Sequence, residues 1–226
     1  MEAGLGPSLC QAKIVRQERF LERALAARSD CRKPLFDALQ TLQPLRARIA
    51  GELSTVESLR GLEGAAQAAY MRAYTALFAE ALGFLRRNRR PPRDPVNACL
   101  SLGYTLTHFE ALRCALAAGL DPFLGFFHEI AFGRESLACD LIEPVRPSVY
   151  AWVWELFRSR WLRPEHFKTD KGACVLEKTG RARFYEHFEG FLPPAARRLR
   201  GYCRLLARAM RSHVLDIPAA DEEDEP

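Results

Sequence analysis

Four polar side chains stand in apolar segments far apart in the sequence. Glu63 is spaced at helical intervals from small and aromatic residues, and His128 stands among phenylalanines. Asp140 and Glu143 lie three residues apart in an apolar stretch, on one face of an expected helix. A buried carboxylate or imidazole is costly unless a partner satisfies it. Carboxylate oxygens with one imidazole suit Mg²⁺ or Mn²⁺, so the pattern predicts a divalent cation held by Glu63, His128 and Glu143.

Spacing alone leaves less specific interpretations open. His128 also fits a hydrogen-bonded core histidine, and Asp140 also fits an ion pair with Arg146. Other chemistries lack their motifs, because His128-Glu129 begins like a zinc-protease HExxH but no second histidine follows. The sequence also has no GxxxxGK[ST] phosphate-binding loop, no GxSxG elbow and no CxxC pair.

Hydrophobic periodicity predicts a mostly α protein, a single multi-helix domain of eight or nine helices over residues 9–214. Residues 1–8 are expected to be disordered, and residues 215–226 to form an acidic disordered tail. A turn at Asp170-Lys171-Gly172 predicts one short β-hairpin near 167–176. The expected helices cover residues 9–28, 34–53, 61–87, 96–118, 123–132, a segment around 137–143, 148–162, 180–191 and 194–214.

The charge of the chain favours a polyanionic partner. Residues 1–220 carry 33 basic against 23 acidic residues, a surplus of ten that suits nucleic acid or an anionic membrane surface. Much of the surplus lies in two groups of arginines, and we predict that both contact DNA. For the group on the last helix, a solvated face is an equally good interpretation. The first is the basic loop Arg86, Arg87, Arg89, Arg90 and Arg93, and the second is the last helix with Arg197, Arg200, Arg204 and Arg208.

Cysteine usage and hydropathy point to a cytoplasmic protein. The seven cysteines are at least 15 residues apart and stand in apolar stretches, which is typical of reduced core thiols. The N-terminus lacks the basic and apolar regions of a signal peptide. No uninterrupted apolar run reaches the roughly 18 residues of a membrane span.

Several longer motifs, in order and with their spacing, resemble the CRISPR-associated protein one family of spacer-acquisition integrases. The three that carry the resemblance most strongly are residues 90–104, 119–128 and 136–147. Residues 61–64 are similar to the family's first metal-ligand segment, and residues 10–28 to the helix that opens its catalytic domain.

The resemblance implies a metal-dependent DNA endonuclease and strand-transfer integrase that inserts spacers into the CRISPR repeat array. It places Mg²⁺ or Mn²⁺ on Glu63, His128 and Glu143, with Asp140 supporting the site. Three further residues match positions near the family's site, where they imply support or phosphate contact: Asn97, Tyr104 and Arg146. The partners it implies are double-stranded or branched DNA (protospacer and repeat), a second copy in a homodimer, and the small ferredoxin-fold CRISPR-associated protein two, with no membrane.

The resemblance covers residues 9–214, which correspond to the family's catalytic domain. Family members begin with a small β-rich domain, and this sequence starts where that domain would end. A truncated, non-catalytic DNA-binding subunit is therefore the alternative function. Membrane-surface association is a third hypothesis, and it rests on net charge alone.

Overall fold

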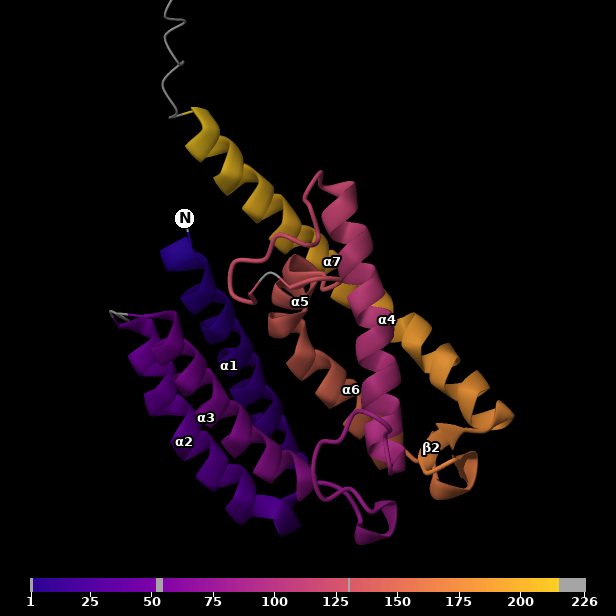
Figure 1. Cartoon of the computed structure of the whole chain (residues 1–226). Helices are drawn as coiled ribbons and strands as arrows, with labels where there is room; N and C mark the ends of the chain where they lie inside the picture. Colours follow the sequence, from indigo (N-terminus) through magenta and orange to yellow (C-terminus); the bar gives the residue numbers. More distant parts are fainter. Residues whose placement is uncertain (1, 52–54, 130, 216–226) are drawn as a thin grey trace, which may run out of the picture.

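The computed structural model describes residues 2–51, 55–129 and 131–215 (Figure 1). In this part of the chain seven α-helices and one antiparallel hairpin form the fold, with short 3₁₀ turns between them. The helices are α1 (Glu2–Ala27), α2 (Arg32–Ala50), α3 (Val56–Thr75), α4 (Pro95–Ala117), α5 (Ser136–Ile142), α6 (Arg146–Arg158) and α7 (Lys178–Leu215). The strands are β1 (Phe167–Asp170) and β2 (Ala173–Leu176), and the 3₁₀ turns are η1 (Ser29–Cys31), η2 (Glu80–Leu82), η3 (Glu143–Val145) and η4 (Pro164–His166).

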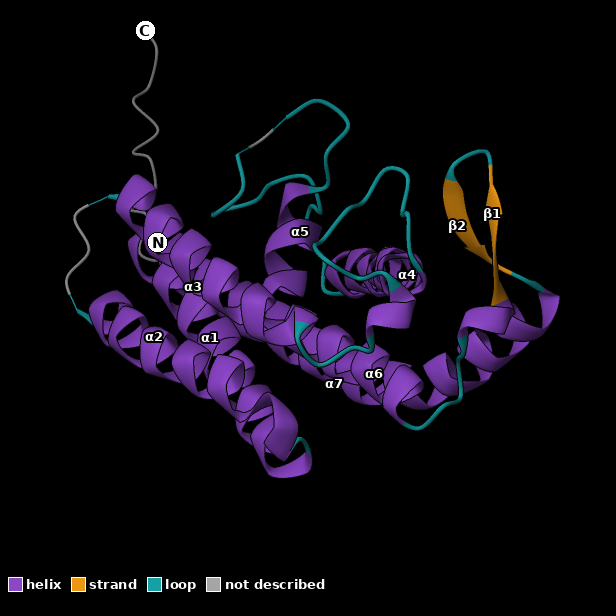
Figure 2. Cartoon of the chain, turned by 90° about the horizontal axis from the view of Figure 1, so that it is seen from below, coloured by secondary structure: helices purple, strands orange, loops and turns teal. Residues whose placement is uncertain are grey.

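The helices form two groups that meet along α1. Helices α1, α2 and α3 lie side by side, and α4 packs against α5, α6 and α7 (Figure 1). Helix α1 also packs against η3 and α6, which joins the two groups. The hairpin stands at the end of the molecule opposite α2 (Figure 2). The architecture confirms the predicted mostly α class with one short hairpin.

An aromatic core holds the groups together. Phe20 of α1 packs edge-on against Tyr70 of α3 and Trp154 of α6, with ring centroids 5.9 and 5.6 Å apart. Tyr74, one turn after Tyr70, donates a hydrogen bond of 2.9 Å to the carbonyl of Tyr150. These four side chains are buried, and each such ring removes a large apolar area from water. A smaller apolar cluster lies between the second half of α4, α5 and α7.

Two local predictions are confirmed residue by residue. Asp94 caps α4 by accepting a hydrogen bond from the backbone N–H of Asn97 at 2.8 Å, with Pro95 at the first helical position. The hairpin turns through Lys171 and Gly172, whose φ angles of 47° and 79° suit a two-residue turn between antiparallel strands.

The predicted number of helices is too high because two of the expected helices are one. Helix α7 runs continuously through Pro193 and Pro194, where the prediction placed a break. Each proline removes a backbone donor. Phe188 and Leu199 are buried on either side of the pair, and this tertiary packing outweighs the low helix propensity of proline.

Other predicted boundaries are wrong at the ends of helices. The α1 helix begins at Glu2, so residues 2–8 are helical and not a disordered segment. Helix α3 ends at Thr75, 12 residues before its expected limit at residue 87. The carbonyls of Ala76 and Leu77 accept hydrogen bonds from Cys31 Sγ and Arg28 Nη1, which replace the next helical turn. Residues 216–226, the expected acidic tail, lie outside the described residues.

The predicted helix over residues 123–132 is also wrong. The described residues from 121 to 135 form turns and bends that cross from α4 to α5. The cause is the Asp140 carboxylate, which accepts backbone N–H groups that helical carbonyls would otherwise accept. Within the described residues, every helix is too short or too polar to cross a membrane.

Candidate active site

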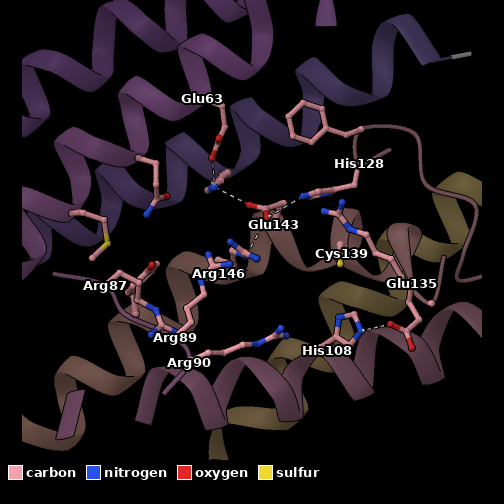
Figure 3. A pocket seen from close by; sticks show the side chains of 17 residues that line it. Glu63, Arg87, Arg89, Arg90, His108, His128, Glu135, Cys139, Glu143 and Arg146 are labelled. Atoms are coloured by element: carbon pink, nitrogen blue, oxygen red, sulfur yellow. Dashed lines mark hydrogen bonds and ion pairs between the residues drawn. The ribbon is translucent and has the colours of Figure 1, made fainter. Parts of the chain in front are cut away.

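A polar cavity of about 800 Å³ lies between the α1–α3 group and the helices α4 and α5. Figure 3 shows that Glu63, His128, Glu143 and Arg146 converge on one side of it, whereas His108 and Glu135 stand at the other. Its lining is Lys13, Glu63, Gln67, Met71, Arg87, Arg89, Arg90, His108, Phe127, His128, Gly133, Arg134, Glu135, Cys139, Glu143, Arg146 and Tyr150. The three residues predicted to hold a cation therefore share one cavity, although they come from α3, a loop and η3.

A buried ammonium joins the two predicted carboxylates. Lys13 Nζ donates to Glu143 Oε2 at 2.7 Å and to Glu63 Oε1. Lys13 is 3% exposed, on the face of α1 that packs against η3 and α3. The two acids and the lysine thus form one charged cluster, with Lys13 and Glu143 buried and Glu63 half-buried, in which each charge is compensated by its neighbours.

The electrostatics of this cluster favour its charged form. Burial by itself would raise the pKa of Glu143, but Lys13 and Arg146 outweigh it and lower the pKa to about 2. Burial would likewise lower the pKa of Lys13, but the charges of Glu143 and Glu63 outweigh it and raise the pKa. Lys13 and the Glu143 carboxylate are therefore both charged at neutral pH.

His128 is oriented by a buried carboxylate. Its Nδ1 lies 2.5 Å from Asp140 Oδ1, and its Nε2 lies 4.0 Å from Glu143 Oε1. Asp140 is 0% exposed. A carboxylate on one ring nitrogen fixes the tautomer and leaves the other nitrogen for a ligand, as in histidines that bind metals. The other interpretation of Asp140, an ion pair with Arg146, is not what the structure has, since Arg146 pairs with Glu143 at 3.1 Å.

Asp140 also explains why residues 123–132 are not helical. Its two carboxylate oxygens accept the backbone N–H groups of Phe126, Phe127 and His128 at 2.7, 3.0 and 3.0 Å. These donors would otherwise bond to helical carbonyls. Gly125 permits the close approach, because a Cβ there would meet Asp140 Oδ2 at 2.9 Å. The loop is thus wrapped around the carboxylate that orients the histidine.

Tyr104 supports two arginines at the edge of the cavity. The guanidinium groups of Arg87 and Arg146 lie 5.7 and 5.3 Å from its ring centroid. Burial lowers the pKa of Arg87, and that guanidinium donates to Asn97 Oδ1 and Ser101 Oγ at 2.7 and 3.1 Å. The ring of Tyr104 thus lies within cation–π distance of both guanidinium groups.

Asn97 holds the basic loop in shape. The side chain is 0% exposed, and its Nδ2 donates to the carbonyl of Arg86 at 2.9 Å and to Asp94 Oδ2 at 2.6 Å. Its Oδ1 accepts the backbone N–H of Asn88 as well as the Arg87 guanidinium. The structure thus places Asn97 behind the loop and outside the cavity lining.

The predicted DNA-binding arginines separate into two sets. Arg87, Arg89 and Arg90 line the cavity, whereas Arg86 and Arg93 do not belong to its lining. The arginines of α7 are exposed and absent from the lining, and Arg200 lies 3.9 Å from Glu110. Those four are Arg197, Arg200, Arg204 and Arg208.

Four further residues of the cavity lining were not predicted from the sequence: Lys13, and His108, Arg134 and Glu135 on the far wall. Lys13 had a detectable signal, because it follows Leu9 and precedes Phe20 on one apolar stripe of α1, where a lysine needs a buried partner. His108 faces Glu135 at 3.5 Å. No spacing rule relates these two, since 27 residues and a loop separate them.

The donor set fits a divalent cation in its chemistry. Glu63 and Glu143 offer carboxylate oxygens, and the Asp140-bound imidazole offers Nε2, a combination suited to Mg²⁺ or Mn²⁺. A positive charge already lies between the two carboxylates in the form of the Lys13 ammonium. Across residues 2–51, 55–129 and 131–215, no three His, Cys, Asp or Glu side chains lie close enough together to hold a metal ion in this arrangement.

Fold and cavity together define an α-helical domain built around buried carboxylates, an oriented imidazole and a rim of arginines. A family model described as CRISPR associated protein Cas1 matches residues 3–190. A curated relative from Thermodesulfovibrio yellowstonii, CRISPR-associated endonuclease Cas1 1, is 41% identical over 208 residues, which are 88% of this chain and 64% of the relative. This chain belongs to the Cas1 family of CRISPR-associated proteins, as its motifs indicated.

Solved structures agree with that assignment. A partial Cas6-RT-Cas1–Cas2 complex aligns with 100% of this chain and 70% of its own at a TM-score of 0.80 and 25% identity. A casposase bound to integration product aligns with 100% of this chain and 66% of its own at a TM-score of 0.76. The casposase is 22% identical, so that likeness shows the fold. The chain spans less than two thirds of the length of the curated relative.

Proposed function

We propose that this chain is the catalytic domain of a DNA endonuclease and strand-transfer integrase of CRISPR adaptation. The observation that carries the proposal is the convergence of Glu63, Glu143 and the Asp140-oriented His128 in one arginine-lined cavity. The curated relative is named an endonuclease, and the casposase structure contains an integration product. We infer the same substrate class, duplex or branched DNA, for this chain.

Glu63, Glu143 and His128 Nε2 would hold the divalent cation. When bound there, Mg²⁺ or Mn²⁺ supplies charge stabilisation to a phosphodiester whose attacking and leaving oxygens become more negative. Asp140 keeps the imidazole of His128 facing Glu143, so the orientation of this one ligand is set before binding. Arg146 compensates Glu143 and stays close to it at 3.1 Å.

The arginines of the rim would bind the DNA backbone. Arg87, Arg89 and Arg90 line the cavity, and guanidinium forks match phosphate oxygens. Tyr104 and Asn97 hold Arg87 in place, which limits the freedom it loses on binding. These residues position the scissile phosphate near the carboxylates.

A protein nucleophile is not required by this chemistry. Cys139 is the one cysteine of the cavity lining, and burial raises the pKa of its thiol. Burial also raises the pKa of the nearby Cys10, to about 12. Both groups are therefore thiols at neutral pH, a poorly nucleophilic form.

The partners we propose are a second copy of this chain, DNA, and a Cas2-type protein of ferredoxin fold. One aligned structure is a partial Cas6-RT-Cas1–Cas2 complex. Integration joins two DNA ends, which requires two active sites. We infer that two copies act together in the working assembly.

The test uses the full chain with branched DNA and Mn²⁺. The variants Glu63→Gln, His128→Ala and Glu143→Gln are each expected to lower cleavage and strand transfer at least about 100-fold, because each removes a proposed ligand. Glu57→Gln, an exposed acid on the same helix as Glu63, is the matched control and retains activity. Calorimetry with Mn²⁺ measures binding independently of turnover.

Two results would overturn the proposal. One is wild-type activity in all three variants, and the other is salt-sensitive DNA binding without cleavage or strand transfer at any cation concentration. The second result is what the alternative function, a DNA-binding subunit without catalysis, predicts.

A further inference from the structure

Lys13 occupies the position between the two carboxylates that the proposed cation would need. Its ammonium contacts Glu63 Oε1 and Glu143 Oε2, the latter at 2.7 Å. Mg²⁺ lies about 2.1 Å from its oxygen ligands and Mn²⁺ prefers similar oxygen donors. An ammonium and a divalent cation bound to the same two oxygens would be in van der Waals overlap, and their like charges would repel strongly in a buried site. The two occupants exclude each other.

The charge balance of the cluster leads to the same conclusion. Lys13 and Arg146 carry two positive charges against the two negative charges of Glu63 and Glu143. His128 is paired separately with Asp140. These four groups are thus neutral together with Lys13 in place, and a divalent cation added to them would leave a positive excess that the neighbouring Asp140 carboxylate offsets only in part. Withdrawal of the ammonium from the carboxylates removes part of that excess.

One turn along α1 there is an unused acceptor for the ammonium. Gln17 Oε1 is buried and has no hydrogen-bond partner among the described residues, and Gln17 Nε2 donates to Gln67 Oε1 at 3.0 Å. Lys13 and Gln17 are four residues apart on one helix, so their side chains are neighbours on the same face. A buried acceptor without a donor is costly, and the lysine side chain is long and flexible enough to supply one.

We propose that Lys13 is a built-in counter-ion of the metal site, which holds Glu63 and Glu143 together in the cation-free protein and withdraws toward Gln17 when the cation binds. The inference rests on the proposed function, since it assumes that these carboxylates are ligands. Lys13 is a positioning residue in this account. It keeps two acids from repelling each other before the cation arrives, and it weakens cation binding because it must be displaced.

Calorimetry with Mn²⁺ alone tests the competition. Lys13→Met removes the ammonium with little change in side-chain length, and we expect it to bind Mn²⁺ at least about fivefold more tightly than wild type. Lys33→Met removes a lysine from the surface of α2, where Lys33 pairs with Asp37, and it should bind Mn²⁺ like wild type. A lysine that was only structural would give the opposite sign, weaker binding in Lys13→Met.

The outcomes separate the inference from the proposed function. Tighter binding by Lys13→Met, or binding by this variant alone, supports the inference. Equal or weaker binding by Lys13→Met, with clear binding by wild type, overturns the inference and leaves the proposed function in place. Absence of Mn²⁺ binding in both proteins overturns the proposed function itself.

A double-mutant cycle tests the acceptor. Gln17→Met should weaken Mn²⁺ binding several-fold in the wild-type background, because the displaced ammonium then lacks a partner. In the Lys13→Met background the same substitution should have no effect on affinity. An equal effect of Gln17→Met in both backgrounds contradicts the proposed withdrawal toward Gln17.

A measurement on wild type covers the case in which Lys13→Met does not fold. In protein labelled with ¹⁵N-lysine, the Nζ signal of Lys13 is expected to be protected from solvent exchange before Mg²⁺ is added. The signal should shift and lose protection, or move to a second protected position, as Mg²⁺ saturates the site. An unchanged Nζ signal at Mg²⁺ saturation overturns the inference.

Discussion

The same two helices contribute to two buried regions of opposite character. Farther along α1 and α3, Phe20, Tyr70 and Tyr74 belong to an aromatic core with Trp154. Toward the beginnings of those helices, Lys13 and Glu63 belong to the charged cluster of the cavity. The core is stabilised by many apolar contacts, each of small energy. The cluster is stabilised by a few charges that depend on one another.

This difference determines how each region responds to substitution. Loss of one methyl or hydroxyl in the core removes one contribution among many, and its neighbours remain satisfied. Loss of one charge in the cluster leaves a buried partner without compensation. We therefore expect graded effects in the aromatic core and abrupt effects in the charged cluster.

The largest effect is expected for Asp140→Ala. It removes the acceptor of three backbone N–H groups and of His128 Nδ1 at once. Stability should fall by about 3 to 5 kcal/mol, as when one partner of a buried ion pair is removed. Activity should fall at least about 10- to 100-fold, because the imidazole loses its orientation. Denaturant unfolding and a DNA-cleavage assay measure the two effects.

Asp121→Ala is the matched control for that substitution. Asp121 stands in the same loop, is exposed, and accepts one hydrogen bond, from the backbone N–H of Phe123 at 2.9 Å. Its loss should cost about 1 kcal/mol. Equal losses of stability in Asp140→Ala and Asp121→Ala would show that the buried Asp140 carboxylate does not organise the loop.

The loop around Asp140 also shows what a sequence pattern cannot predict. Apolar residues at helical spacing over 123–132 predicted a helix, because periodicity reports which residues avoid water. It does not report that a carboxylate 14 residues later will accept the N–H of Phe126. In contrast, the start of α4 was predictable, since the Asp94 cap and Pro95 act within one turn.

The candidate site, like the fold, was predictable from the sequence only in part. Polar residues in apolar stretches singled out four candidates, and the family resemblance selected Glu63, His128 and Glu143 among them, which the structure brings into one cavity. Lys13 was not predicted because only groups that could bind a metal ion were considered. The ammonium of Lys13 is itself a cation, and it already balances the two acids.

The second effect concerns pH. Glu143 has a folded pKa of about 2, lowered from 4.5 by Lys13 and Arg146 against the opposing effect of burial. The unfolded chain thus takes up a proton at higher pH than the folded one. Stability from this group is complete above about pH 4.5 and is lost as pH falls toward 2, on the order of 3 kcal/mol in total.

Unfolding by urea between pH 6 and pH 2.5 measures this dependence. Wild type should lose more stability over that range than Glu143→Gln, whose neutral amide does not titrate. Glu189→Gln, an exposed acid on α7, should follow wild type. Identical slopes in all three proteins would place the acid sensitivity outside the charged cluster.

A smaller effect distinguishes two neighbouring tyrosines of the core. Tyr74→Phe removes the hydrogen bond from the hydroxyl to the carbonyl of Tyr150 and should cost about 1 kcal/mol. Tyr70→Phe removes a buried hydroxyl that has no hydrogen-bond partner among the described residues, so it should be neutral or stabilising. Thermal and urea unfolding compare the two, and equal losses would contradict the unpaired state of the Tyr70 hydroxyl. Neither should change DNA cleavage.

The smallest effect compares arginines inside and outside the cavity, in one basic loop. Arg90 belongs to the cavity lining and Arg93 does not, so a DNA strand inside the cavity is expected to contact Arg90. Arg90→Ala should weaken DNA binding by up to about tenfold and lower the salt slope of log affinity by about one. Arg93→Ala is the matched control, and it should change the DNA affinity and the salt slope by less than half as much as Arg90→Ala does. Fluorescence anisotropy at several salt concentrations measures both, and equal losses would mean that the loop attracts DNA through its charge without directing it into the cavity.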